Sequence, residues 1–310
     1  MAQQKLFWTV VVLIKIDICS DLHVDRHFEQ TRLLVKPGEG PTHWPADQYG
    51  DREAFFHFDF EWHRNAGSST LIIAGDVSDH LSDVYDVLSH ACKFYDNVVF
   101  VDGNHEHHGN KDAEVSDNCD EITDFKISLP NLIYLDGQSN ASAVVGRTAF
   151  IGGNGWYDWR CHEKKGISFP KAFASWDDNS QDRHLNFGDY EFPSTLGYEQ
   201  VESIVSEVRK ATLDQNIDTI VMVTHSAPLA ECLIWYDDRP SWNLGSPSYV
   251  NTELAQVFEA DTNKKIRLWA YGHTHTRRTW QYNGIMMVNN CYGYPKENTG
   301  GWSMSNFEVI

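Results

Sequence analysis

Two pairs of residues in this chain have a spacing that lets both side chains of a pair reach one ion. Asp21 and His23 lie two positions apart, and so do His273 and His275. In an extended chain, residues i and i+2 point to the same side. Each pair could therefore hold one metal ion from one direction.

Three further residues extend this set to seven oxygen and imidazole ligands without a thiolate: Asp76, Asn104 and His225. Such ligands suit manganese, iron or zinc better than a structural zinc held by cysteines. Seven ligands are too many for one tetrahedral ion. Two ions about 3.5 to 4 Å apart are the usual arrangement for phosphate-ester hydrolysis. We expect Asp76 to be the carboxylate that both ions share.

A water between two such ions loses its proton near neutral pH, which gives a hydroxide for attack on phosphorus. The stretch "VDGNHEHHGN" (residues 101–110) offers a second kind of chemistry beside the ligand Asn104. His105 is free to act as a general acid at the leaving group. Asp79 is the obvious partner to fix its tautomer. His107 and His108 are loop residues or contacts at the substrate rim, and we favour loop.

These polar residues follow five apolar runs that are too continuous for half-exposed strands, so we expect strands buried on both faces. The runs are residues 10–19, 69–75, 96–103, 218–225 and 266–273. The carboxyl ends of strands in α/β sheets are where ligands bind, so the polar clusters should meet at one rim. Helix-like segments at 83–97, 198–216 and 251–264 alternate with the strands, which predicts a layered α/β fold.

We expect a single domain over residues 1–310 with an aromatic, cap-like insertion at about 154–197, where no period is sustained. A long irregular segment is usually a functional lid or cap. The alternative is an ordinary surface loop with buried tryptophans. A second aromatic loop covers residues 234–249. Side chains of these loops could contact phosphate or base, although surface or core packing is the plainer interpretation for each: Trp156, Trp159, Arg160, His162, Arg183, His184 and Arg239.

The formal net charge of -19 repels polyanions, so a nucleic-acid partner is disfavoured. Six scattered cysteines indicate free thiols and a cytoplasmic location. The apolar run at 6–14 is about half of the roughly 20 residues that a membrane span needs, and no cleavage signature follows it. We therefore expect a core strand and no membrane partner. Whether residues 1–12 have a role, and what oligomer forms, stays open.

Five motifs in this order resemble the signature of the calcineurin-like metallophosphoesterase superfamily: DLH at Asp21, GDVSD at Gly75, GNHE at Gly103, THSAP around His225 and GHTH at Gly272. The resemblance runs from about residue 13 to "NNCYGYPKEN" near the C-terminus. It implies a four-layer α/β/β/α fold, in which two mainly mixed β-sheets are flanked by helices. One metal would be held by Asp21, His23, Asp76 and His275, and the other by Asp76, Asn104, His225 and His273. His105, oriented by Asp79, would protonate the leaving group or bind the phosphate, and Glu106 would have a structural part.

Departures from two subfamilies narrow the resemblance. Phosphoprotein phosphatases carry arginines where this chain has His80 and Asp102, and purple acid phosphatases carry a tyrosine at the position of Asp79. What remains resembles bacterial and phage-type phosphodiesterases, although those commonly read GNHD. The leading hypothesis is a hydrolase of a small phosphate ester, a diester or nucleotide, that uses a metal-bridging hydroxide. The alternatives are a nuclease or phosphomonoesterase of the same fold, or a non-catalytic metal-binding scaffold, which the complete ligand set argues against.

Overall fold

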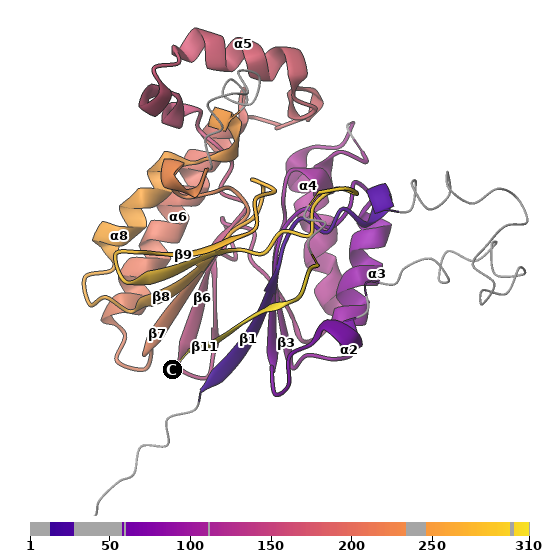
Figure 1. The fold of residues 1–310 in the computed structure, drawn as a ribbon, viewed down its shortest axis with the longest axis vertical. Coiled ribbons are helices and arrows are strands. Elements are labelled where there is room, and N and C mark those ends of the chain that lie inside the picture. The colour runs from indigo at the N-terminus through magenta and orange to yellow at the C-terminus, as the bar shows by residue number, and fades with distance from the viewer. Residues whose placement is uncertain are drawn as a thin grey trace, which may run out of the picture.

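The computed structural model describes residues 13–27, 58, 60–110, 112–233, 246–297 and 301–309. Within these ranges the strands form two sheets that face each other (Figure 1). The five-stranded sheet has the order β11 (Ser305–Val309), β1 (Ile14–Cys19), β2 (Thr70–Ala74), β3 (Asn97–Val101) and β4 (Leu132–Tyr134). The six-stranded sheet has the order β5 (Ser142–Val145), β6 (Thr148–Gly153), β7 (Thr219–Thr224), β8 (Ile266–Ala270), β10 (Ile285–Asn289) and β9 (Arg278–Tyr282).

Both sheets are mixed. Strands β1 to β4 are parallel, and β11 pairs antiparallel to β1. Strands β6, β7, β8 and β10 are parallel, while β5 and β9 close the edges of their sheet in the antiparallel sense. The carboxyl ends of the parallel strands in each sheet therefore lie together. Five of these strands end in the predicted polar clusters: β1, β2, β3, β7 and β8.

Alternate residues of each strand pack on opposite sides, which explains the continuous apolar runs. Ile16 and Ile18 of β1 share a buried cluster between the sheets with Val221 and Val223 of β7. On the other side of the five-stranded sheet, Leu71 packs in a second cluster with side chains of the flanking helices. Burying a side chain of this size contributes about 1.5 to 3 kcal/mol. Burial on both faces fixes the register of the strands and with it the position of their polar ends.

Helices cover the outer face of each sheet (Figure 1). The five-stranded sheet packs against α2 (Phe60–His63), α3 (Leu81–Ala91) and α4 (Val115–Asp124). The six-stranded sheet packs against α6 (Pro193–Leu213) and α8 (Gln256–Ala260). The predicted α/β fold, with two mixed sheets flanked by helices, is confirmed.

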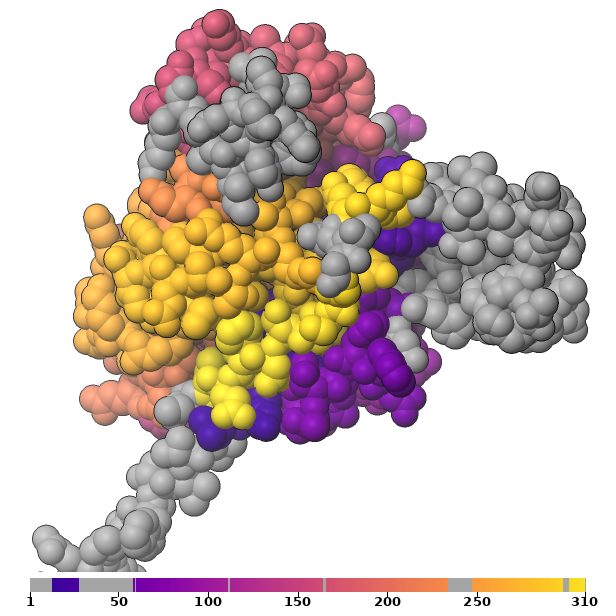
Figure 2. All heavy atoms as spheres, viewed as in Figure 1, coloured from indigo at the N-terminus to yellow at the C-terminus, as the bar shows by residue number. Residues whose placement is uncertain are grey.

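Residues 154–197, hereafter the aromatic segment, include a helix, α5 (Phe169–Asn179), that stands at one end of the molecule (Figures 1 and 2). The prediction of an irregular chain there is wrong for sixteen residues, because the eleven residues of α5 and residues 193–197, which begin α6, are helical. Only Ala172 and Trp176 of α5 are buried, so its hydrophobic period is too weak to recognise. Two short 3₁₀ helices accompany it, η4 (Arg160–Lys165) and η5 (Asp182–His184).

The other helix predictions need smaller corrections. Helix α6 begins at Pro193, five residues before the predicted start at Tyr198, because proline is favoured in the first turn. The segment predicted as one helix at 251–264 divides into η8 (Thr252–Ala255) and α8, and Lys264 has a positive φ of 55°. The predicted first strand begins at Ile14, and its expected part before residue 13 lies outside the described residues, as do residues 234–245 of the second aromatic loop.

Two further observations concern the whole described chain. No helix within it has the length and hydropathy that a membrane crossing requires. All six cysteines of the sequence lie in the described ranges, and no disulfide joins any two of them.

Candidate metal centre

The candidate site lies where β1, β2, β3, β7 and β8 end, and its backbone is strained. Positive φ angles occur at five of the seven predicted ligands: Asp21 (51°), His23 (43°), Asp76 (57°), His273 (67°) and His275 (47°). A left-handed conformation costs about 1 to 3 kcal/mol for residues other than glycine. Strain of this kind persists only where the surrounding fold imposes it, and it concentrates at functional sites.

Two glycines allow the strand ends to approach each other. A Cβ atom at Gly75, whose φ is 79°, would lie 2.5 Å from His225 Nδ1. A Cβ atom at Gly103 would lie 2.2 Å from Asp76 Oδ1. Both distances are far below van der Waals contact, so the side chains of Asp76 and His225 reach their places only because these two positions carry no side chain.

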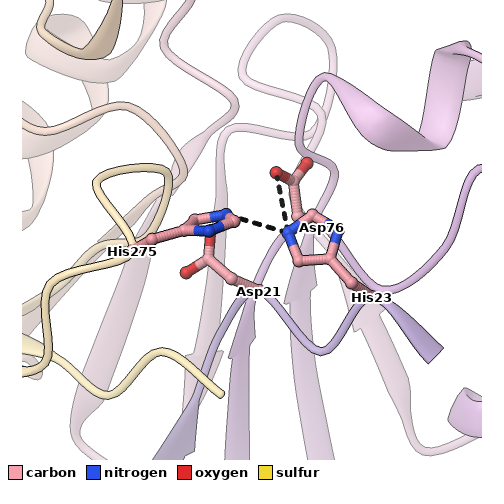
Figure 3. A group of neighbouring side chains, drawn as sticks. All are labelled: Asp21, His23, Asp76 and His275. Atoms are coloured by element: carbon pink, nitrogen blue, oxygen red, sulfur yellow. Dashed lines mark hydrogen bonds and ion pairs between the residues drawn. The ribbon is translucent and has the colours of Figure 1, made fainter. Parts of the chain in front are cut away.

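The first group of converging side chains comprises Asp21, His23, Asp76 and His275 (Figure 3). One ligand atom from each lies within 4.8 Å of those of the others. His23 Nε2 is 2.9 Å from His275 Nε2 and 3.8 Å from Asp76 Oδ2. His275 Nε2 is 3.7 Å from Asp21 Oδ1. The four atoms surround one position, as ligands of a single ion do.

A second group comprises Asp76, His225, His273 and the amide of Asn104. The ligand atoms of its carboxylate and two histidines also lie within 4.8 Å of one another. His225 Nε2 is 3.3 Å from Asp76 Oδ2, 3.1 Å from His273 Nδ1 and 3.2 Å from Asn104 Oδ1. Asp76 belongs to both groups, and the structure brings all seven predicted ligands together.

Three of the ligand histidines are oriented by a hydrogen bond at the ring nitrogen that does not face the site. His225 Nδ1 donates to the Ala74 carbonyl (2.9 Å), and His273 Nε2 donates to the Ser248 carbonyl (3.0 Å). His275 Nδ1 donates to Glu297 Oε2 (2.8 Å). These bonds assign the tautomers, and each leaves a lone pair directed into the site. Sequence reasoning missed Glu297 and Ser248, because neither stands in a motif.

The charges of the site fit bound cations. Asp21 and Asp76 are fully buried, and within the described chain their ion pairs are with histidines alone. Burial raises the pKa of Asp21, whereas His225 and His105 overcome the effect of burial on Asp76 and hold its pKa well below the usual value. Burying two carboxylates without cations is costly. Two divalent ions would balance these charges with donors of the required type.

His105 lies beside the two groups and has its own partners. Its Nδ1 is 2.5 Å from Asp79 Oδ1, and its Nε2 is 3.1 Å from the hydroxyl of Tyr294. Arg26 Nη2 in turn donates to Asp79 Oδ2 (2.5 Å). Burial lowers the pKa of His105, but the charges of Asp76 and Asp79 outweigh it and raise that pKa to about 9. The structure thus places the predicted His105–Asp79 pair in direct contact and adds Tyr294 and Arg26, which sequence reasoning missed.

Glu106, His107 and His108 are buried in and directly after η2 (His105–His107). Glu106 accepts from the backbone N–H groups of Asp76, Val77 and Gly103 at 3.0, 2.6 and 2.6 Å, so it joins two of the strand ends. His107 lies in η2, which differs from the favoured loop interpretation, whereas His108 lies in the turn after η2, as a loop residue does; both are buried. His107 pairs with Asp102 (3.0 Å) and His108 with Asp182 (2.7 Å), in polar contacts that no local pattern reveals.

The aromatic candidates lie apart from the ligands. Trp156 and Trp159 pack in a buried aromatic cluster with Trp176, which agrees with core packing. Arg160 pairs with Glu253 and, with His162, lines a cavity of about 640 Å³ that none of the seven ligands borders. Arg183 and His184 are exposed on η5, and Arg239 lies outside the described residues.

A two-sheet α/β sandwich with carboxylates and imidazoles gathered at its strand ends is the architecture of a metal-dependent phosphoesterase. The sequence profile described as calcineurin-like phosphoesterase matches residues 14–277, and the chain belongs to this family. The resemblance in the five motifs is thereby confirmed. The chain is a hydrolase that acts on phosphoric ester bonds, in a family with dinuclear metal centres.

Two relatives illustrate how far this similarity extends. Uncharacterized protein L509 of Acanthamoeba polyphaga mimivirus is 25% identical over 240 residues, which cover 73% of this chain and 79% of the viral protein. The structure of phosphopantetheinyl hydrolase (PptH) from Mycobacterium tuberculosis superposes with a TM-score of 0.67 at 17% identity, covering 96% of this chain and 95% of that one. The second similarity demonstrates a shared fold.

Proposed function

We propose that this chain hydrolyses a small phosphodiester or nucleotide with two metal ions, and that Asp76 ligates both. The observation that carries the proposal is the position of Asp76 Oδ2, which lies 3.8 Å from His23 Nε2 in one group and 3.3 Å from His225 Nε2 in the other. Oxygen and imidazole ligands favour manganese, iron or zinc. Bound ions would supply the charge that activates a water and stabilises the phosphoryl oxygens.

The chain's own residues support a division of labour around these ions. His105 Nε2 faces the site, and Asp79 holds the opposite nitrogen. We propose that Nε2 of His105 gives a proton to the leaving oxygen. The hydroxyl of Tyr294 bonds to the same nitrogen, so a substrate oxygen would replace it there. Arg26 forms ion pairs with Asp79 and with Asp25 (3.1 Å). Its contact with Asp79 fixes the carboxylate that holds His105.

The position of Asp102 supports a diester over a phosphoprotein substrate. Where phosphoprotein phosphatases carry a clamping arginine, this carboxylate is buried and accepts hydrogen bonds from Tyr134 (2.8 Å), His107 (3.0 Å) and Asn154 (3.2 Å). A phosphate monoester carries about -1.5 to -2 charges at neutral pH, whereas a diester carries a single one. A site without that arginine is therefore better suited to the diester.

We further propose that one domain carries the site, with the aromatic segment inserted after β6 and running into the first turn of α6. Six cysteines without a disulfide between them support a reducing compartment such as the cytoplasm. The net charge of -19 supports a small substrate over a long nucleic acid.

The test is a hydrolysis screen with the metal-depleted chain reconstituted in turn with manganese, iron and zinc. Its substrates are bis-para-nitrophenyl phosphate, para-nitrophenyl phosphate, cyclic AMP and single-stranded DNA. We expect turnover of the diester or the cyclic nucleotide to exceed that of the monoester. A preference for the monoester would make the chain a phosphomonoesterase, and DNA cleavage that falls steeply with salt would make it a nuclease. Inactivity with every metal would favour the scaffold.

A further inference from the structure

The aromatic segment places a buried carboxylate beside the proposed metal centre. Asp182 of η5 is 4% exposed, and its oxygens accept three hydrogen bonds from side chains. Asn104 Nδ2 donates to Oδ1 (3.0 Å), His108 Nε2 lies 2.7 Å from the same oxygen, and the Tyr157 hydroxyl donates to Oδ2 (2.7 Å). Asp182 is therefore a junction between the segment and the loop that follows β3.

The contact with Asn104 decides which end of an amide faces the metals. A carboxylate only accepts hydrogen bonds, so the amide NH₂ must point toward Asp182. The carbonyl oxygen then points into the second ligand group, 3.2 Å from His225 Nε2. If the amide were rotated by half a turn, its oxygen would face the carboxylate and its NH₂ would face the metal position. Asp182 thus selects the only orientation in which Asn104 can be a ligand.

The contact with His108 places a second ring against the proposed general acid. Because Nε2 of His108 is held by Asp182, its Nδ1 lies 3.8 Å from Asp79 Oδ1. That nitrogen is buried and has no hydrogen-bond partner among the described residues. The rings of His108 and His105 are 4.5 Å apart between centroids. Asp182 therefore holds the ring of His108 against that of His105.

A chain of hydrogen bonds ties Asp182 to the core of the aromatic segment. Trp176 of α5 donates through Nε1 to the Tyr157 hydroxyl (2.6 Å), which in turn donates to Asp182. The ring of Tyr157 is stacked on that of His273, with 5.9 Å between centroids and 7° between planes. The segment is thus linked to two proposed ligands, Asn104 through Asp182 and His273 through Tyr157.

We propose that Asp182 is a positioning residue, which orients Asn104 as a ligand of the second metal and makes the aromatic segment an integral part of the metal centre. The inference rests on the proposed function, because it takes Asn104 as a ligand. It assigns the segment a role other than that of a lid that closes over substrate. A merely structural Asp182 would hold the segment in place without affecting how the chain binds metal.

The test is a calorimetric titration, in which the heat of Mn²⁺ binding to the metal-free chain is measured with Mn²⁺ as the only ligand. Loss of a residue that orients a ligand typically weakens metal binding about 10- to 100-fold. We expect Asp182→Ala to weaken one of two Mn²⁺ sites by that factor and to leave the other site unchanged. Asp182→Leu keeps nearly the same side-chain shape without an acceptor, so it gives the same answer if the alanine variant does not fold.

The matched control is Asp158→Ala, which truncates another buried carboxylate of the same segment. Asp158 is 5% exposed and accepts from the hydroxyl and the backbone N–H of Thr252 (2.6 and 2.9 Å). We expect this variant to bind two Mn²⁺ ions with the affinity of the unmodified chain. Equal weakening in Asp158→Ala and Asp182→Ala would show a general effect of the segment and would overturn the inference.

A double variant tests whether Asp182 acts through Asn104. Asn104→Ala alone should weaken the same Mn²⁺ site, and adding Asp182→Ala should produce little further loss. Full additivity, or unchanged Mn²⁺ affinity in Asp182→Ala, would overturn the proposal. An unmodified chain that binds two Mn²⁺ ions but hydrolyses nothing would refute the proposed function, while the Mn²⁺ affinities would still decide the role of Asp182.

Discussion

Replacement of His105 by alanine should separate the proposed proton transfer from metal binding. Nδ1 of His105 is held by Asp79 at 2.5 Å, so Nε2 is the nitrogen that can face a leaving oxygen. In the metal-free chain, the charges of Asp76 and Asp79 raise the pKa of this ring to about 9, which favours the protonated form that can donate. The contact of residue 105 with Asp76 is made by its backbone N–H (2.9 Å), which alanine retains. Metal content should therefore be unchanged.

The size of the expected loss depends on the leaving group. General acid catalysis contributes about 10²- to 10⁴-fold. At 1.36 kcal/mol per factor of ten, this is about 2.7 to 5.4 kcal/mol of transition-state stabilisation. An alkoxide needs the proton and should show the full loss in His105→Ala. Para-nitrophenolate departs without a proton and should show much less.

The assay compares kcat for two phosphodiesters that differ only in the leaving group, which is an alkoxide in one and para-nitrophenolate in the other. Metal content is measured on the same samples. His184→Ala is the control, because His184 is an exposed histidine that belongs to neither ligand group. Equal losses with both esters would refute proton donation and would assign His105 to phosphate binding. Loss of metal from His105→Ala would contradict its separation from the ligands.

Three further predictions follow from contacts of the site. Asp79→Asn removes a charge that raises the pKa of His105, so the ring should lose its proton at a lower pH. The alkaline limb of the plot of kcat against pH should therefore shift to lower pH. An unshifted limb would contradict the pairing of His105 with Asp79. Glu297→Ala leaves His275 Nδ1 without its acceptor and should weaken one metal site about 10- to 100-fold, measured by Mn²⁺ titration. Gly103→Ala sets a methyl group 2.2 Å from Asp76 Oδ1. This change should lower the free energy of unfolding by about 1 to 3 kcal/mol, measured by denaturant titration, and should also cause loss of metal.

The ligand set could be predicted because it depends on local rules. Each of the seven ligands lies within five residues of the end of a buried parallel strand, and His225 directly follows β7. The expectation that a spaced pair reaches one ion fits Asp21 and His23, which share one group, and is wrong for His273 and His275, which lie in different groups. Neither pair is extended chain, because all four residues have a positive φ. Parallel strands bring their carboxyl ends together, so the sequence carries nearly all the information needed to place these side chains side by side. The α/β fold was predictable for the same reason, because strands buried on both faces give continuous apolar runs.

The residues that support the ligands could not be predicted. Asp182, Glu297 and Tyr294 each lie far along the chain from the side chain they contact, in segments without strand or α-helix periodicity. Their positions depend on how irregular segments pack, which no local pattern encodes. Helix α5 was missed because its only buried residues, Ala172 and Trp176, are too few to show a period.

The central claim is that Asp76 ligates both metal ions, and metal content of Asp76→Asn tests it most directly. The amide is nearly isosteric with the carboxylate, so the fold should survive, but it lacks the charge that faces His23 and His225. We predict that the unmodified chain, reconstituted with manganese, holds two ions per molecule by elemental analysis, and that Asp76→Asn holds neither of them after the same treatment. Retention of two ions with full activity in the variant would contradict the account.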